Sequence, residues 1–130
     1  MDSLGNFRKA VDKLQQALEI PKDRELVVEG TIQRFETVVE LVWKTLNRCL
    51  RYEGVHPNSP RDTMIEGFAI GWLSGTIVWQ DLLDRRNKSS HEYLDDSFIE
   101  EYYDEIKELF IPIKELLEFL ENRYMSLSNQ

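Results

Sequence analysis

The residues with the most chemical potential in this sequence lie together in the stretch RRNKSSHEY, residues 85–93. Arg86 precedes His91 by five positions, and Tyr93 follows two positions after the histidine. A histidine titrates near neutral pH, so it can move a proton to or from a ribose 2′-hydroxyl. An arginine keeps its charge and can hold a phosphate through two parallel hydrogen bonds. Arg86 and His91 are therefore candidate catalytic residues of a ribonuclease that needs no metal.

This pair can act together only if a helix ends between its two members. On one continuous helix, five positions turn the side chains about 140° away from each other. The polar run Asn87–Ser90 is a suitable place for a helix to end. From spacing alone an alternative stays open, in which Arg85 and Arg86 are cations that suit the dipole of a helix C-terminus. In that interpretation His91 is simply an exposed histidine.

A second candidate group lies on a long helix that the sequence predicts upstream. Its members share one polar face at helical spacing: Glu36, Glu40, Trp43, Lys44, Asn47 and Arg51. One interpretation is a row of ion pairs along the helix, each worth about a few tenths of a kcal/mol. The other is that this face lines a cleft, with Glu40 and Lys44 supporting the binding of RNA or a nucleotide beside Arg86 and His91.

Carboxylates gather near the start of the last predicted helix, at positions 100, 101, 104, 105 and 108. A di-iron bundle would need Glu-x-x-His on two helices. Glu53-x-x-His56 is the one instance in the sequence, and Gly54 interrupts it. A solvated face or a docking surface explains the acidic run better, so we predict no metal site and no cofactor. Phosphate-binding glycine loops and zinc-ligand spacings are also absent from the sequence.

Composition places the chain among soluble helical proteins. Its 130 residues suit a single domain, 1–130, and six glycines with four prolines are few for a β-sandwich. The net charge of −8 argues against a general nucleic-acid coat, so contacts with RNA must be local. The lone Cys49 cannot close an internal disulfide and is predicted to be buried. With no signal peptide and no membrane span in the sequence, we predict a cytoplasmic protein.

Apolar residues recur every three or four positions almost throughout the chain, which predicts helices. The first predicted helix runs from Leu4 to Leu18 and is closed by Pro21. The second covers about residues 24–52 and stops at Gly54. Ser59-Pro60-Arg61-Asp62 resembles a capping box with proline in the first helical position, and it opens a short helix that ends near Trp72.

Two further helices complete the predicted fold. Ser74 can cap one that continues to about Arg86, although the run of residues 75–79 is short and apolar and could also form a strand. Ser97 and Glu100 form a capping box for the last helix, which runs to about Tyr124 and is kinked or split at Pro112. We therefore predict an all-α, up-and-down bundle of about five helices around a four-helix core.

Four stretches occur in order along the chain: GTIQRFETVVELVWKTL, SPRDTMIEGFAIGWL, WQDLLDRRNKSSHEY and YYDEIKELFIPIKELLEFL. Together they resemble the HEPN-fold family called nucleotidyltransferase substrate-binding proteins, over about residues 4–122. The resemblance implies a five-helix bundle that forms homodimers. It also implies a partner chain, a minimal nucleotidyltransferase, with RNA or a nucleotide as ligand.

The resemblance further implies roles for individual residues. Many HEPN proteins resemble metal-independent ribonucleases with an Arg-x4–6-His motif near the dimer interface, and with their transferases they resemble toxin–antitoxin modules. In the pattern Arg-x4-His-x-Tyr the tyrosine accepts AMP from the partner, which corresponds here to Arg86, His91 and Tyr93. Asn87 matches the Arg-Asn pair common in this subfamily, and Arg85 is an additional cation. Two other functions stay open: a non-catalytic subunit that binds nucleotide or substrate, and a helical adaptor.

Overall fold

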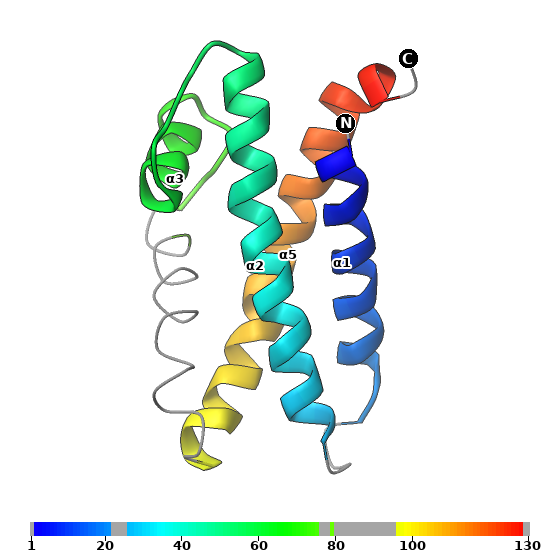
Figure 1. Ribbon diagram of the computed structural model, residues 1–130. Coiled ribbons are helices and arrows are strands. Elements are labelled where there is room, and N and C mark those ends of the chain that lie inside the picture. The colour runs from blue at the N-terminus through cyan, green and yellow to red at the C-terminus, as the bar shows by residue number, and fades with distance from the viewer. Residues whose placement is uncertain (1, 22–25, 76–78, 80–95, 129–130) are drawn as a thin grey trace.

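The computed structural model describes residues 2–21, 26–75, 79 and 96–128 of the chain. These residues form four α-helices and contain no strand (Figure 1). The helices are α1 (Asp2–Glu19), α2 (Val27–Tyr52), α3 (Pro60–Ala69) and α5 (Asp96–Ser128). The prediction of an all-α fold is therefore confirmed.

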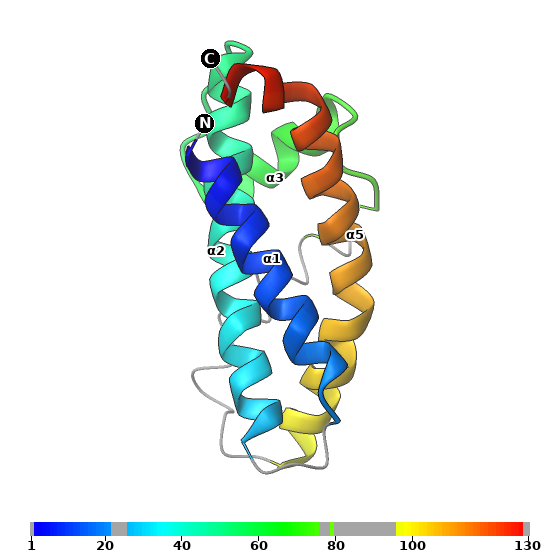
Figure 2. The same cartoon turned by 90° about the vertical axis from the view of Figure 1, so that its right-hand side faces the viewer.

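The three long helices lie lengthwise against one another, and the short helix covers one end of α2. α2 contacts each of the other three helices, and α1 also contacts α5. Figures 1 and 2 show α3 beside the half of α2 that leads to Tyr52. This arrangement is a helical bundle, as the spacing of the apolar residues predicted.

The core of the bundle comes from the apolar stripes of the three long helices. Ten α2 residues are buried, and they include an apolar stripe at helical spacing: Ile32, Phe35, Val39, Val42, Leu46 and Leu50. Cys49 is fully buried, and burial raises the pKa of its thiol to about 12. The other two helices contribute residues at the same spacing: Leu4, Phe7, Val11 and Leu14 of α1, and Ile106, Ile113, Leu117 and Leu120 of α5.

Polar contacts fix α1 against α5 at the rim of this core. The Arg8 guanidinium donates to both carboxylate oxygens of Glu121 and is also paired with Asp12. Lys114 Nζ donates to Gln15 Oε1 at 3.1 Å. Because Arg8 and Glu121 lie near opposite ends of the chain, this ion pair joins the first helix to the last.

The helix boundaries near α3 follow the local signals in the sequence. Gly54 has φ +87°, a conformation that favours glycine, and it follows the last residues of α2. Ser59 Oγ accepts from the Asp62 backbone N–H at 3.0 Å, with Pro60 in the first turn. Gly67 then faces α2 so closely that an added Cβ would lie 3.0 Å from Leu46 Cδ2. α3 ends at Ala69, slightly before the predicted Trp72.

The last helix differs from the prediction at its start, and its middle excludes one of the two predicted alternatives. α5 begins at Asp96, so Ser97 lies inside the helix and does not cap it. Pro112 lies within one continuous helix, so the predicted alternative of two separate helices is wrong. Proline removes one backbone hydrogen bond, and the buried side chains on both sides of Pro112 hold the helix together across it.

Candidate functional site

The residues that the sequence marks most strongly lie outside the described part of the chain. Arg85, Arg86, Asn87, His91 and Tyr93 all fall within residues 80–95. Of the predicted helix from Ser74 to Arg86, and of the possible strand at residues 75–79, only residues 74, 75 and 79 are described. The structure instead gives the framework on either side of the motif, together with Glu40 and Lys44.

Trp79 is the last described residue before the motif. Its side chain is buried, and its indole Nε1 donates to the Ser74 carbonyl oxygen at 2.9 Å. An indole needs a partner for its N–H when it is buried, and the Ser74 carbonyl supplies one. Leu73, which directly precedes Ser74, is buried against Gly67 of α3. The described residues before the motif are therefore anchored to the core at Leu73 and Trp79.

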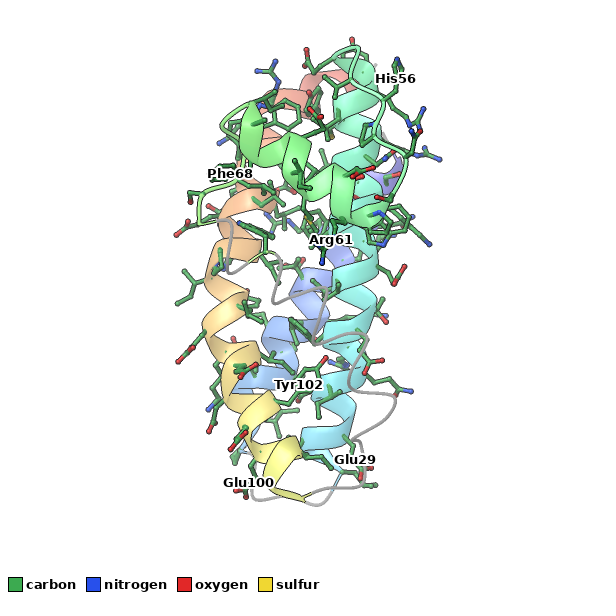
Figure 3. All side chains as sticks on the ribbon, turned by 90° about the vertical axis from the view of Figure 1, so that its left-hand side faces the viewer. Glu29, His56, Arg61, Phe68, Glu100 and Tyr102 are labelled. Atoms are coloured by element: carbon green, nitrogen blue, oxygen red, sulfur yellow. The ribbon has the colours of Figure 1, made fainter. Side chains whose placement is uncertain are left out.

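The start of α5 is the first described segment after the motif, three residues beyond Tyr93. Tyr102 is buried there, with its ring 5.8 Å from the ring of Phe35 on α2 at an angle of 87°. Figure 3 shows Glu29 and Glu100 near one end of the bundle and His56 at the opposite end. The beginnings of α2 and α5 thus lie at the same end of the molecule.

The acidic residues at the start of α5 point mostly to solvent. Glu100, Glu101, Asp104 and Glu108 are exposed, while Tyr102, Tyr103 and Ile106 fill the buried face of the same turns. Acidic residues also suit the first turns of a helix because of its dipole. Within the described ranges, no three His, Cys, Asp or Glu side chains are grouped closely enough to hold a metal ion. This exposure fits both predicted explanations of the run, a solvated face and a docking surface.

Glu40 and Lys44 form a local polar cluster on α2. Lys44 Nζ lies 4.0 Å from Glu40 Oε2, and the indole Nε1 of Trp43 donates to the same oxygen at 3.2 Å. The Lys44 ammonium also lies 5.9 Å from the centre of the Trp43 ring. The predicted ion pair along the helix is therefore present, and an exposed pair of this kind is worth about 0.3–0.5 kcal/mol. Whether this face also supports a ligand beside Arg86 stays a prediction.

The C-terminal half of the same polar face holds the loop that leads into α3. Asn47 Nδ2 donates to the Pro57 carbonyl oxygen at 3.2 Å and lies 3.1 Å from Thr63 Oγ1. Arg51 Nε donates to Asn47 Oδ1 at 2.8 Å, and its Nη2 donates to the Pro57 carbonyl oxygen at 3.3 Å. These residues position α3, a role that the i, i+4 pattern in the sequence did not reveal.

Replacing Asn47 with alanine should therefore destabilise the fold. The change removes one of the two donors to the Pro57 carbonyl oxygen and a partner of the fully buried Thr63, so we expect the free energy of unfolding to fall by about 1–3 kcal/mol. Asn122→Ala is the matched control, because that side chain is exposed, and it should change stability by less than about 0.5 kcal/mol. Equilibrium urea denaturation measures both. Equal stabilities of the two variants would contradict the role of Asn47.

A second cluster joins the end of α2 to α5, at the same end of the bundle as α3. Glu53 Oε1 accepts from the Tyr124 hydroxyl at 2.7 Å and from Arg123 Nη2 at 2.9 Å. The Tyr124 hydroxyl and then Arg123 lower the pKa of Glu53, whereas burial and the Glu53 carboxylate raise the pKa of Tyr124. The Arg123 guanidinium lies over the ring of Trp72 at 5.3 Å. Glu53 is thus engaged with Arg123 and Tyr124 of α5.

A small pocket of about 240 Å³ lies at this end of the bundle, between the loop after α2 and α3. His56, Asp62 and Glu66 line it together with Val55, Pro57, Asn58 and Ile65. Arg51 Nη1 lies 3.4 Å from His56 Nδ1. His56 is therefore a neighbour of the residues that position α3.

No helix among the described residues combines the length and the apolar character that crossing a bilayer requires.

Comparison with known proteins places most of this chain in one family. The family model described as "Nucleotidyltransferase substrate binding protein like" matches residues 2–122. A curated protein of Haemophilus influenzae, named "Probable ribonuclease HepT", is 29% identical over 105 residues, which cover 77% of this chain and 71% of that protein. A crystal structure of a protein from Thermus thermophilus superposes with a TM-score of 0.81, covering 88% of this chain and 98% of that one. Because the two sequences are only 22% identical, this likeness shows a shared fold alone.

Proposed function

This chain belongs to the HEPN-fold family of nucleotidyltransferase substrate-binding-like proteins, and from that premise we propose that it is a metal-independent ribonuclease paired with a minimal nucleotidyltransferase. The observation that carries the proposal is the sequence Arg86-x4-His91-x-Tyr93 within a chain of this family. The likeness to a protein named as a probable ribonuclease supports it. We place the activity in the cytoplasm, where RNA and ATP are both present.

The proposed reaction uses the RNA's own 2′-hydroxyl as nucleophile. His91 accepts the proton of that hydroxyl, the 2′-oxygen bonds to the adjacent phosphorus, and the bond from phosphorus to the 5′-oxygen breaks. The products are a 2′,3′-cyclic phosphate and a 5′-hydroxyl, and the departing 5′-oxygen takes up a proton. Arg86 holds the phosphate and balances the charge that develops on its oxygens. This scheme consists of proton transfers and the replacement of one phosphorus–oxygen bond by another, and it requires no metal.

Neighbouring polar residues have supporting roles in this proposal. Arg85 adds a second permanent charge, and the Asn87 amide can donate to a phosphate oxygen or a base. Lys44 supplies a further cation on α2, and Glu40 holds it through the 4.0 Å ion pair. Because the chain has a net charge of −8, binding of the negatively charged RNA backbone depends on such local cations.

We propose that AMP transfer to Tyr93 switches the ribonuclease off. The Tyr93 phenol attacks the α-phosphorus of ATP bound by the partner transferase, the bond to the β-phosphate oxygen breaks, and pyrophosphate leaves. The attached AMP brings a phosphate next to Arg86 and His91. That phosphate can occupy the guanidinium, and the adenosine can block the entry of RNA. In this arrangement the ribonuclease is the toxin and the transferase is the antitoxin.

We also propose that the active unit is a homodimer with the Arg86–His91 pairs of both chains near the two-fold axis. One such pair is a weak phosphate site on an acidic chain, and two pairs that face one groove double the local positive charge. We expect sedimentation at micromolar concentration to give twice the mass of 15.4 kDa. A monomer under these conditions would contradict the dimer.

A second candidate function is that of a non-catalytic subunit, and the description of the family as substrate-binding proteins favours it. In that case Arg86 would bind a nucleotide phosphate that the transferase uses. Nucleotide binding that depends on Arg86, together with no RNA cleavage by the wild type, would support this function. If neither is found, the helical adaptor is left as the third alternative.

A further inference from the structure

A polar groove lies between α1 and α2, and none of its described lining residues belongs to the Arg86–His91–Tyr93 motif. It has a volume of about 590 Å³ and is lined by Ala10, Lys13, Gly30, Gln33, Arg34 and Thr37. Ala10 and Gly30 lie where larger side chains would fill the space between two packed helices. An added Cβ at Gly30 would meet nothing within 4 Å, so the groove is open at that point.

The charged residues among these six are both cations. Lys13 and Arg34 are exposed on facing helices, and Gln33 and Thr37 add an amide and a hydroxyl. No carboxylate is among the described lining residues, although the chain carries 24 acidic residues against 16 basic ones. An anion in this groove would therefore meet attractive charge and polar groups from two helices.

One hydrogen bond to α1 orders the Arg34 side chain at the edge of the groove. Its Nη1 donates to the Lys13 carbonyl oxygen at 2.7 Å, so the guanidinium of α2 reaches across to the backbone of α1. This bond uses one of the five N–H donors of a guanidinium. A guanidinium already ordered by the protein loses less conformational entropy when it binds a phosphate.

We propose that this groove binds the phosphate backbone of single-stranded RNA through Lys13 and Arg34. The inference rests on the proposed function, because it takes RNA as the ligand, and it adds a second contact region outside the Arg86–His91 motif. Neutralising phosphates with lysine and arginine releases counterions, which makes the affinity dependent on salt. A free nucleotide shares the phosphate chemistry, so the experiment includes AMP as a separate ligand.

The first test removes the two cations. A fluorescent single-stranded 2′-O-methyl RNA, which lacks the nucleophilic hydroxyl, reports binding without cleavage. We expect Lys13→Gln with Arg34→Gln to weaken its binding about 25-fold at about 0.1 M salt, and to reduce the salt slope by about 1.4. Arg61→Gln with Lys107→Gln is the charge-matched control, because both side chains are exposed on other helices. It should leave the affinity within about two-fold, because neither side chain lines the groove.

The second test adds a negative charge to the groove. Gly30→Glu places a carboxylate beside Lys13 and Arg34, whereas Gly5→Glu makes the same change on α1. Both glycines are the fourth residue of their helix, and an added Cβ at either meets nothing within 4 Å. The two variants should therefore fold equally well by circular dichroism. We expect only Gly30→Glu to weaken RNA binding.

The outcomes separate this inference from the ribonuclease proposal. If RNA binds the wild type and both groove variants equally, the groove does not bind RNA, and the proposed function is unaffected. If the groove variants lose binding but the wild type leaves unmodified RNA intact, the groove stands and the ribonuclease proposal fails. Failure of the wild type to bind RNA, or loss of AMP binding alone in the Lys13/Arg34 variant, overturns the groove as an RNA site.

Discussion

Replacing His91 with alanine should reduce the rate of RNA cleavage by the purified protein by about 10²–10⁴-fold. The imidazole is the one group in the proposed site that can accept a proton near neutral pH. Alanine leaves the 2′-hydroxyl without a base, so the attack on phosphorus becomes slow. A gel assay on a labelled single-stranded RNA measures the rate, and circular dichroism reports whether the helical fold is kept.

Arg86→Ala should be similarly damaging, by about 10²–10³-fold, because it removes the charge that balances the phosphate oxygens in the transition state. Arg86→Lys should also fail to restore cleavage, since lysine has no planar pair of donors for the phosphate.

Lys88→Ala is the matched control for the arginine variants, because it removes one positive charge from the same polar stretch. We expect it to retain cleavage within a few-fold of the wild type. Full activity of Arg86→Ala or His91→Ala, or an equal loss in Lys88→Ala, would show that the motif does not act as proposed.

The second large effect is expected at Tyr93. Incubation with the cognate nucleotidyltransferase, magnesium and ATP should add one AMP to the wild type and stop its RNA cleavage. Tyr93→Phe lacks the phenolic oxygen that attacks the α-phosphorus, so it should gain no AMP. The hydroxyl takes no part in the cleavage steps, so this variant should cleave RNA normally and stay active in the presence of the transferase. Mass spectrometry of the intact protein and of its peptides measures the modification.

Tyr52→Phe is the control for general tyrosine reactivity. Tyr52 is 63% exposed at the end of α2, so it is an accessible phenol on the described surface. This variant should accept AMP and lose activity like the wild type. AMP found on Tyr52, or an AMP on Tyr93 that leaves RNA cleavage unchanged, would sink the proposed switch.

Local signals predicted the architecture well. Ser59, Pro60 and Gly54 each act through their own backbone or through a neighbour three residues away, so they can be interpreted without tertiary structure. The apolar spacing gave the core for the same reason, since Leu46 and Ile106 are buried where a helical stripe requires it. Pro112 shows the limit, because packing on both sides of it, rather than local preference, decided that α5 is continuous.

Contacts between segments that are distant along the chain could not be predicted from the sequence. Glu53 forms hydrogen bonds with Arg123 and Tyr124 across about 70 positions, and no pattern around any of these residues predicts the contact. The groove has the same origin, since Lys13 and Arg34 become neighbours only when α1 packs on α2. The motif of Arg86, His91 and Tyr93 was found in the opposite way, from residue types and spacing and from the family resemblance, and its geometry lies outside the described residues.

The most direct test of the central claim is RNA cleavage by the purified wild-type protein in the presence of excess EDTA, beside His91→Ala. We predict that the wild type cuts single-stranded RNA and leaves 2′,3′-cyclic phosphate ends, and that His91→Ala leaves the RNA intact. Cleavage that EDTA abolishes, cleavage that persists in His91→Ala, or no cleavage by the wild type would contradict a metal-independent ribonuclease built on Arg86 and His91.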